Sequence, residues 1–261
     1  MNENPYASPA ELPKEPSEEE KYARGLRRLQ RGVGWISWSC VPMATLPAIR
    51  MLEITGVLKY SGSEVVFGIW CLCVAAILCF PVMQLTGLIL CCFCPAGLVK
   101  RGRRYVLGSL GLLGAAVLVP VLIGFIDIMI FTLGDPSHLL TNILMIGWTA
   151  STVVWLIFLL RLARGLQSTA GIWLARSVIV LLGMLAAGVI AHTNIELYYY
   201  FRYTYESPWK DYWQANKPPL EILLIGMTIV YCGVYAGLLN TLRRRIVCSL
   251  QFVVCRQEEQ T

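Results

Sequence analysis

Five charged or titratable side chains lie within long apolar stretches of this sequence or near their ends, and they are the first candidates for chemistry. Asp127 lies four residues and His192 nine residues, or roughly 6 and 14 Å of helix, from the end of such a stretch. Glu196 follows His192 by four residues and shares its helical face, and Arg50 and Glu53 share a face in the same way. Because a charge in hydrocarbon costs several kcal/mol unless it is paired or hydrated, these residues form the candidate polar cluster.

This cluster has two interpretations. If the helices face one another, Asp127 and Glu196 would accept a cation, a proton or a small solute, with His192 as the titrating group or metal ligand. Alternatively the side chains satisfy one another, for example Asp127 with Arg50, or snorkel to the interface. We favour the second interpretation because Glu53 and Glu196 lie near enough to the interface to be hydrated. A His and a Glu without a third ligand predict no metal site.

Three cysteines, Cys91, Cys92 and Cys94, end the second apolar stretch. Their spacing is not Cys-x-x-Cys and no histidine is near, so a metal site completed by Cys248 or Cys255 is only a minor alternative. We expect no disulfide there, because this end of the stretch is predicted to face the reducing cytoplasm. The sequence predicts no metal and no cofactor.

Aromatic side chains crowd the segment before the last apolar stretch, which we expect to be broken at Pro208 and again at Pro218 and Pro219. Such rings favour the headgroup region of a membrane. A stacking surface for a sugar or a peptide is the alternative. The candidate outer aromatic surface consists of Tyr203, Tyr205, Trp209 and Trp213.

No motif for catalysis lies on a supporting element. A Walker loop, a dinucleotide glycine pattern, a nucleophile elbow and a His-Glu-x-x-His motif are all missing from the sequence. Only two histidines occur in 261 residues, and neither has the partners of a triad nearby. We therefore predict no catalytic residues, and an enzyme is the least favoured class.

The elements that must position these residues are membrane-spanning helices. Of the residues, 56% are hydrophobic and 15% are charged, far from the composition of a soluble domain. Charges cluster between apolar runs of about 20 residues or more, the length a helix needs to cross a bilayer. The fold class is therefore all-α, a polytopic bundle of six transmembrane helices. The six spans are 32–54, 65–93, 106–131, 139–160, 172–201 and 220–242.

Positive charge sets the predicted orientation, because Lys and Arg near the spans are retained in the cytoplasm. The two ends of the chain and the second and fourth loops carry 17 of the 22 Lys and Arg residues. Both termini are therefore predicted to be cytoplasmic. The net charge of +6 points to anionic headgroups at the membrane edge rather than to nucleic acid.

Three regions follow from this pattern. Residues 1–31 are predicted to be a disordered acidic and proline-containing tail that ends in a basic juxtamembrane segment, without a cleavable signal peptide. Residues 32–242 form the transmembrane domain. Residues 243–261 form a basic cytoplasmic tail, either a short amphipathic helix on the anionic leaflet or an extension of the sixth span.

The segment Asn4-Pro5-Tyr6-Ala7-Ser8-Pro9 resembles the N-terminal tails of many uncharacterised bacterial multi-pass membrane proteins. The resemblance covers about ten residues. It implies a bacterial cytoplasmic (inner) membrane and carries no activity or site.

The predicted function is that of a non-enzymatic membrane protein that has a structural or sensing role or binds partners, including other membrane proteins. The first alternative is a small-solute or ion transporter that uses the polar cluster. The second is a membrane-embedded enzyme. Packing signals such as Gly108, Gly111 and Gly183 favour close helix contacts rather than catalysis.

Overall fold

The computed structural model describes residues 17–54, 63–130, 137–202 and 208–258. Side chains outside the description include those of Glu53, of residues 123–130 and of residues 196–218. The described chain is helical, and each predicted span lies on one helix and runs past its end by at most two residues. In chain order the helices are α1 (Glu18–Ile54), α2 (Ser63–Cys91), α3 (Gly102–Ile130), α4 (Ser137–Gly165), α5 (Thr169–Arg202) and α6 (Pro208–Glu258).

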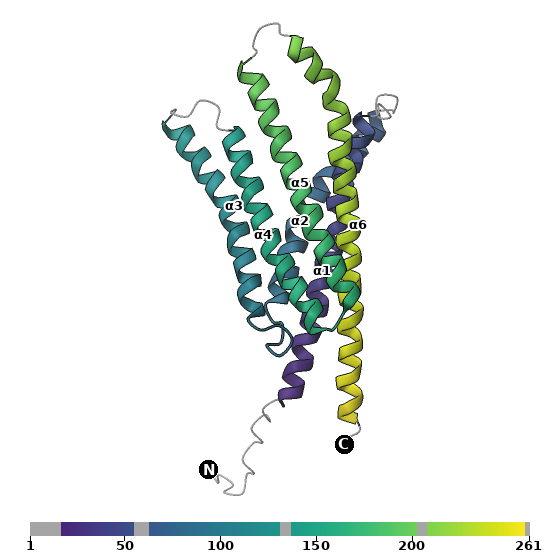
Figure 1. The fold of residues 1–261 in the computed structure, drawn as a ribbon. Coiled ribbons are helices and arrows are strands. Elements are labelled where there is room, and N and C mark those ends of the chain that lie inside the picture. Colours follow the sequence, from purple (N-terminus) through teal and green to yellow (C-terminus); the bar gives the residue numbers. More distant parts are fainter. Residues whose placement is uncertain (1–16, 55–62, 131–136, 203–207, 259–261) are drawn as a thin grey trace, which may run out of the picture.

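The helices run alternately up and down, and the start of α1 and the end of α6 lie at the same end of the bundle (Figure 1). The packing order is α2, α1, α6, α5, α4, α3, since each helix contacts its neighbours in that row most. α2 and α3 are consecutive in the chain but share only a small contact. The pair of α1 and α6 therefore lies inside the row although the two helices are the first and the last of the chain.

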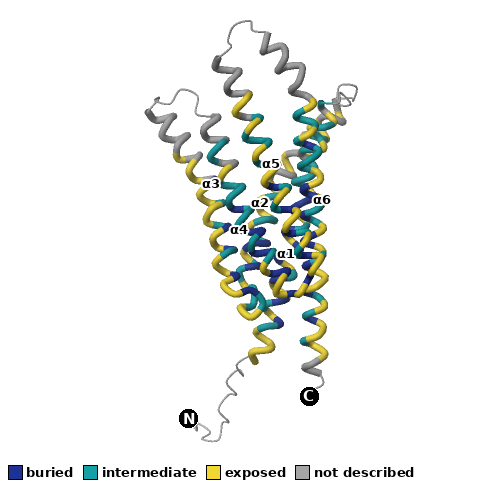
Figure 2. The backbone as a smooth tube through the Cα atoms, viewed as in Figure 1, coloured by how far each residue is buried: buried dark blue, intermediate teal, exposed yellow. Residues whose placement is uncertain are grey.

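The core lies toward the end of the bundle that holds the start of α1 and the end of α6, where the buried residues gather (Figure 2). On α1, Leu26, Leu29, Val33 and Ile36 recur at helical spacing and are fully buried. α4 and α6 supply most of the facing side chains, including Trp155, Phe158, Leu159, Leu162, Tyr231, Tyr235, Leu238, Leu242 and Ile246. Away from this core, large apolar side chains are exposed on all six helices, as expected for a surface in contact with lipid.

Three helical stretches are long and apolar enough to cross a membrane, judged by length and composition within the described residues. They are Ile146–Gly165, Thr169–His192 and Pro219–Cys255, and Leu78–Cys91 of α2 is a shorter apolar stretch. Pro219–Cys255 has 37 residues, or roughly 55 Å of helix, which exceeds a hydrocarbon core of about 30 Å. One end of α6 must therefore project from a membrane that it crosses.

α1 begins inside the segment for which the sequence predicts a disordered tail. The Ser17 hydroxyl accepts a hydrogen bond of 3.2 Å from the backbone N–H of Glu20 and so caps the helix. Glu18, Glu19 and Glu20 fill the first turn, where the helix dipole favours negative charge. The basic juxtamembrane residues consequently lie on a helix, with Ala23, Leu26 and Leu29 buried between them.

α6 is continuous through Pro218 and Pro219, so the predicted break there is wrong. Proline fixes a φ that a helix accepts, and the hydrogen bonds it removes can be replaced by water where the helix lies near an interface. The helix also continues through residues 243–258. In that part Ile246 and Leu250 are buried and the three arginines 243–245 are exposed, so the segment extends α6 with one face in the core.

Candidate functional site

α1 and α6 are joined at the end remote from the core by an ion pair. The Nη2 atom of Arg50 lies 3.6 Å from Oε2 of Glu221, and the Glu221 side chain is the more buried of the two. From the sequence alone, Glu53 or Asp127 is the expected partner of Arg50. The structure pairs Arg50 with Glu221, a residue that the sequence does not single out. Its only signal is an acidic residue at the start of the sixth apolar stretch.

The other members of the predicted polar cluster are placed only in part. His192 lies on α5 and is half-buried. Asp127 lies on α3, Glu196 on α5 and Glu53 on α1, but their side chains lie outside the description. α3 packs mainly on α4, whereas α1 packs on α2 and α6. A convergent ion or solute site remains a prediction.

The candidate aromatic surface also lies largely outside the description. Tyr203 and Tyr205 fall between α5 and α6 in the undescribed segment 203–207. Trp209 and Trp213 are on the first turns of α6, without described side chains. The stacking surface remains a prediction.

The three cysteines at the end of α2 enter the core end of the bundle. Cys91 is fully buried against α1, and Cys92 and Cys94 are half-buried. Among the residues that the structure describes, no three His, Cys, Asp or Glu side chains are grouped so that they could hold a metal ion. Burial raises the pKa of the Cys94 thiol to about 12, so at neutral pH this side chain is a thiol rather than a thiolate.

We expect Cys94 to react slowly with N-ethylmaleimide at pH 7 because only the thiolate attacks. Its rate should rise about tenfold per pH unit up to about pH 12, since each unit below the pKa lowers the thiolate fraction tenfold. The measurement is the labelling rate of a variant that keeps Cys94 alone, in permeabilised membranes. A matched variant that keeps only the exposed Cys255 should label faster. Equal rates for the two cysteines at pH 7 would contradict the burial of Cys94.

Polar contacts in the interior tie the helices together, both between neighbours in the row and between α4 and α6. The Trp155 indole Nε1 donates a 2.7 Å hydrogen bond to the Tyr235 hydroxyl, which joins α4 to α6. Ser39 donates to the Gln84 side chain at 2.9 Å, which joins α1 to α2. Ser109 of α3 and the backbone carbonyl of residue 151 on α4 are joined at 3.0 Å. These hydrogen bonds stabilise the bundle.

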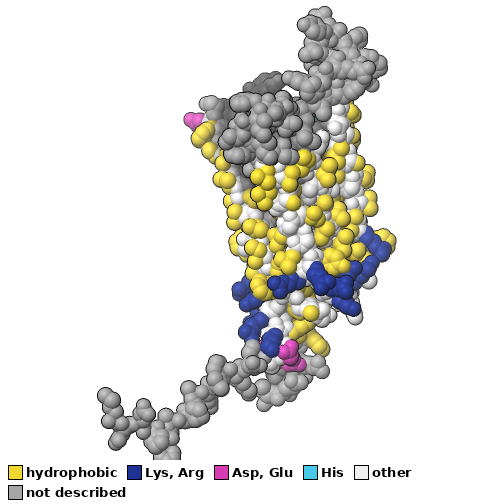
Figure 3. Space-filling view, turned by 90° about the vertical axis from the view of Figure 1, so that its left-hand side faces the viewer, with side chains coloured by type: hydrophobic (Ala, Val, Ile, Leu, Met, Phe, Trp, Pro, Cys, Tyr) yellow, Lys and Arg dark blue, Asp and Glu magenta, His cyan; other side chains and the backbone are white. Residues whose placement is uncertain are grey.

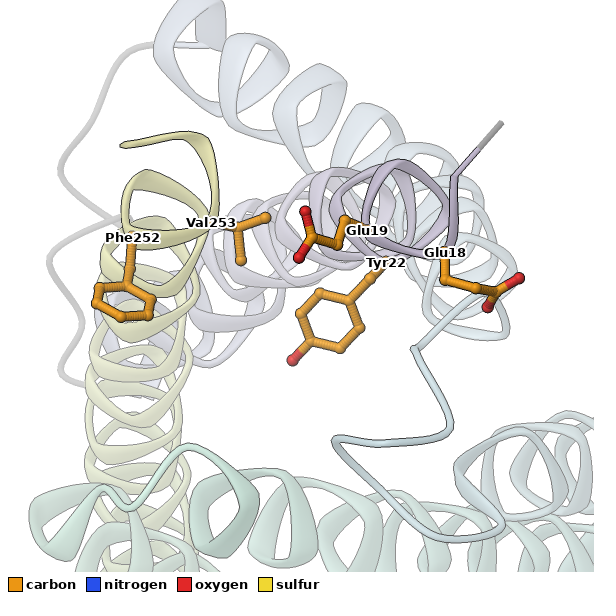
Figure 4. Close-up of a pocket in the computed structure, with 5 residues that line it drawn as sticks. All are labelled: Glu18, Glu19, Tyr22, Phe252 and Val253. Carbon is orange, nitrogen blue, oxygen red and sulfur yellow. The ribbon is translucent and has the colours of Figure 1, made fainter. Parts of the chain in front are cut away.

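A cleft of about 380 Å³ opens between the start of α1 and the end of α6 (Figure 4). Tyr22 and Glu19 of α1 point toward α6, whereas Glu18 points away and pairs with Lys21 at 2.8 Å. Burial raises the pKa of Tyr22, and the nearby Cys94 adds to the rise, so the phenol stays protonated and can donate a hydrogen bond. Phe252 and Val253 of α6 form the apolar side of the cleft.

Phe252 lies near the end of α6 and is 72% exposed. The cleft therefore combines an exposed apolar ring, a carboxylate and a phenol hydroxyl. Such a set can bind an apolar side chain with a neighbouring cation, and it lacks a nucleophile paired with a base.

Comparisons of the chain with protein-family models, with curated proteins and with solved structures gave no match.

Proposed function

We propose that this chain is a six-span membrane protein with both termini in the cytoplasm of a bacterial cell, and that it acts without catalysis as a binding protein. Its cytoplasmic end, the paired ends of α1 and α6, binds a segment of a protein partner. The observation that carries the proposal is the exposed Phe252 beside Glu19 and Tyr22 in the cleft between the two helices.

The orientation is supported by the distribution of charge on the folded chain. On the face shown in Figure 3, Lys and Arg side chains form a band at the end of the bundle that holds the start of α1 and the end of α6, directly below an apolar zone. Basic residues are held on the cytoplasmic side of a membrane. The alternating direction of the six helices agrees with an even number of crossings (Figure 1).

The position of the cleft beyond this basic band supports a partner in the cytoplasm. Phe252 follows Arg243 by nine residues, or roughly 14 Å along α6. The headgroup region adds only about 6 Å on each side of the hydrocarbon, so the ring projects past the lipid. Glu19 supplies negative charge together with Glu18 and Glu20 in the first turn of α1, which favours a segment with an apolar side chain next to Lys or Arg.

A photo-crosslinking amino acid at position 252 in the full chain in cells tests the proposal. We expect a discrete protein adduct that weakens when Glu19 is replaced by lysine, because the charge at the cleft is then reversed. The matched control places the same crosslinker at Leu78, an exposed apolar position in the apolar stretch of α2, where lipid should be the main neighbour. No protein adduct at 252, or an adduct indifferent to Glu19→Lys, would overturn the partner-binding role.

A further inference from the structure

Two adjoining hollows form one open groove along α1 and α6, on the apolar part of the bundle. They share Trp38 of α1 and Arg243 of α6, and their volumes are about 630 and 770 Å³. From Arg243 to Ile229 the groove follows α6 for 14 residues, or roughly 21 Å, more than half of a hydrocarbon core of about 30 Å.

Small side chains on the two helices make the groove. Ala44 and Ala48 of α1 lie opposite Gly233 and Ala236 of α6, and a Cβ atom added at Gly233 would meet nothing within 4 Å. The floor is therefore apolar and empty enough to accept a flexible hydrocarbon chain.

Two arginines close the end of the groove nearest the basic band. Arg31 and Arg243 both line the hollow of about 630 Å³, and both are exposed. The Arg243 guanidinium lies over the buried Gly34, with Cζ and Nε each 3.9 Å from where a Cβ of that residue would be. Arg31 precedes Gly34 by three residues on the same face of α1. Because Gly34 has no side chain, Arg243 can lie close to α1 on the face that carries Arg31.

These two charges have no carboxylate partner within the described chain. The printed sequence has no Asp or Glu from 21 to 52 or from 222 to 257, and neither guanidinium is ion-paired with a described residue. Guanidinium groups bind phosphate oxygens through paired charge-assisted hydrogen bonds. Trp35 and Trp38 edge the same hollow, and Trp38 is 63% exposed, as is typical of indoles at the headgroup level.

From this arrangement we infer that the groove between α1 and α6 is a binding site for one anionic phospholipid. The lipid phosphate lies between Arg31 and Arg243, and an acyl chain lies along Ala44 and Gly233. The inner leaflet as the source of this lipid rests on the proposed orientation. Binding at this site is distinct from the general attraction of basic residues to anionic lipids, because it depends on two particular arginines and on one groove.

The test uses the full chain purified in an uncharged detergent, with bound lipids counted by native mass spectrometry. Phosphatidylglycerol should bind at least about tenfold more tightly than phosphatidylcholine, and inorganic phosphate should not compete at equal concentration. The double variant Arg31→Gln with Arg243→Gln should lose about tenfold in affinity for phosphatidylglycerol. The matched control, Arg244→Gln with Arg245→Gln, removes the same charge from exposed neighbours that line neither hollow.

A second pair of variants tests the acyl chain without changing charge. Gly233→Leu fills the groove and should weaken phosphatidylglycerol binding, whereas Gly111→Leu, at another open and exposed glycine on α3, should not. Equal losses in the two arginine doubles, equal binding of the two lipids, or competition by free phosphate would overturn the site. Crosslinking at position 252 is a separate readout, so failure of the lipid site and failure of partner binding are distinguishable.

Discussion

Replacement of Trp155 by alanine is expected to lower the free energy of unfolding by about 3–5 kcal/mol, the usual cost of removing a large buried aromatic side chain. Trp155 is 2% exposed, and its ring stacks on Phe158 at 5.1 Å between centroids. Its indole N–H also donates a hydrogen bond to the Tyr235 hydroxyl, which loses this donor in the variant. The measurement is reversible unfolding in mixed detergent micelles, followed by far-ultraviolet circular dichroism.

Two further variants separate the causes of this effect. Trp173→Ala removes the same side chain at a position that is 69% exposed on α5, and it should change stability little. Tyr235→Phe removes only the hydroxyl and should cost about 0.6 kcal/mol, the average for hydrogen bonds between helices in a membrane protein, and at most about 1.7 kcal/mol. A loss in Trp173→Ala as large as that in Trp155→Ala would show that Trp155 is not at the core of the bundle.

The helices themselves could be predicted from the sequence because the bilayer fixes both their length and their composition. If a run such as 106–131 crosses hydrocarbon, it must be helical, since every backbone N–H and C=O group must find its hydrogen-bond partner within the segment. The described α3 begins only four residues earlier, at Gly102. The number of crossings and the side on which the termini lie follow from the same pattern and remain proposals.

The neighbours of each helix could not be predicted in this way. Helices that are apolar on all sides, such as α2 and α3, carry little information about which face meets which partner. Only the row found in the structure brings α1 beside α6. The pair Arg50 and Glu221, the cleft at Phe252 and the groove at Arg243 all depend on that one neighbour relation.

The start of α1 has a signal in the sequence that the average composition of residues 1–31 obscures. The segment Ser17-Glu18-Glu19-Glu20 fits a helix cap, and Leu26 and Leu29 continue at helical spacing into the first span. Acidic residues and prolines before it favour disorder, so the average over residues 1–31 obscures the start of α1. The positions that form the cleft with α6 lie within this segment.

Replacement of Gly32 by leucine is expected to cost about 3 kcal/mol or more, because the backbones of α1 and α2 meet at this residue. A Cβ at Gly32 would lie 2.7 Å from the carbonyl oxygen of Gly87 and 2.8 Å from Sγ of Cys91, and backbone atoms cannot move aside as a flexible side chain can. Gly32→Ala should show a smaller loss, since alanine adds one carbon and gains about 1 kcal/mol in helix propensity. The same unfolding measurement on Gly111→Leu provides the control and should show no loss, because the added side chain meets open space at Gly111, where the predicted close helix contact is wrong. If Gly32→Leu is as stable as Gly111→Leu, α1 and α2 do not approach each other through their glycines, and the Ser39 to Gln84 hydrogen bond would then lack the close helix contact that it requires.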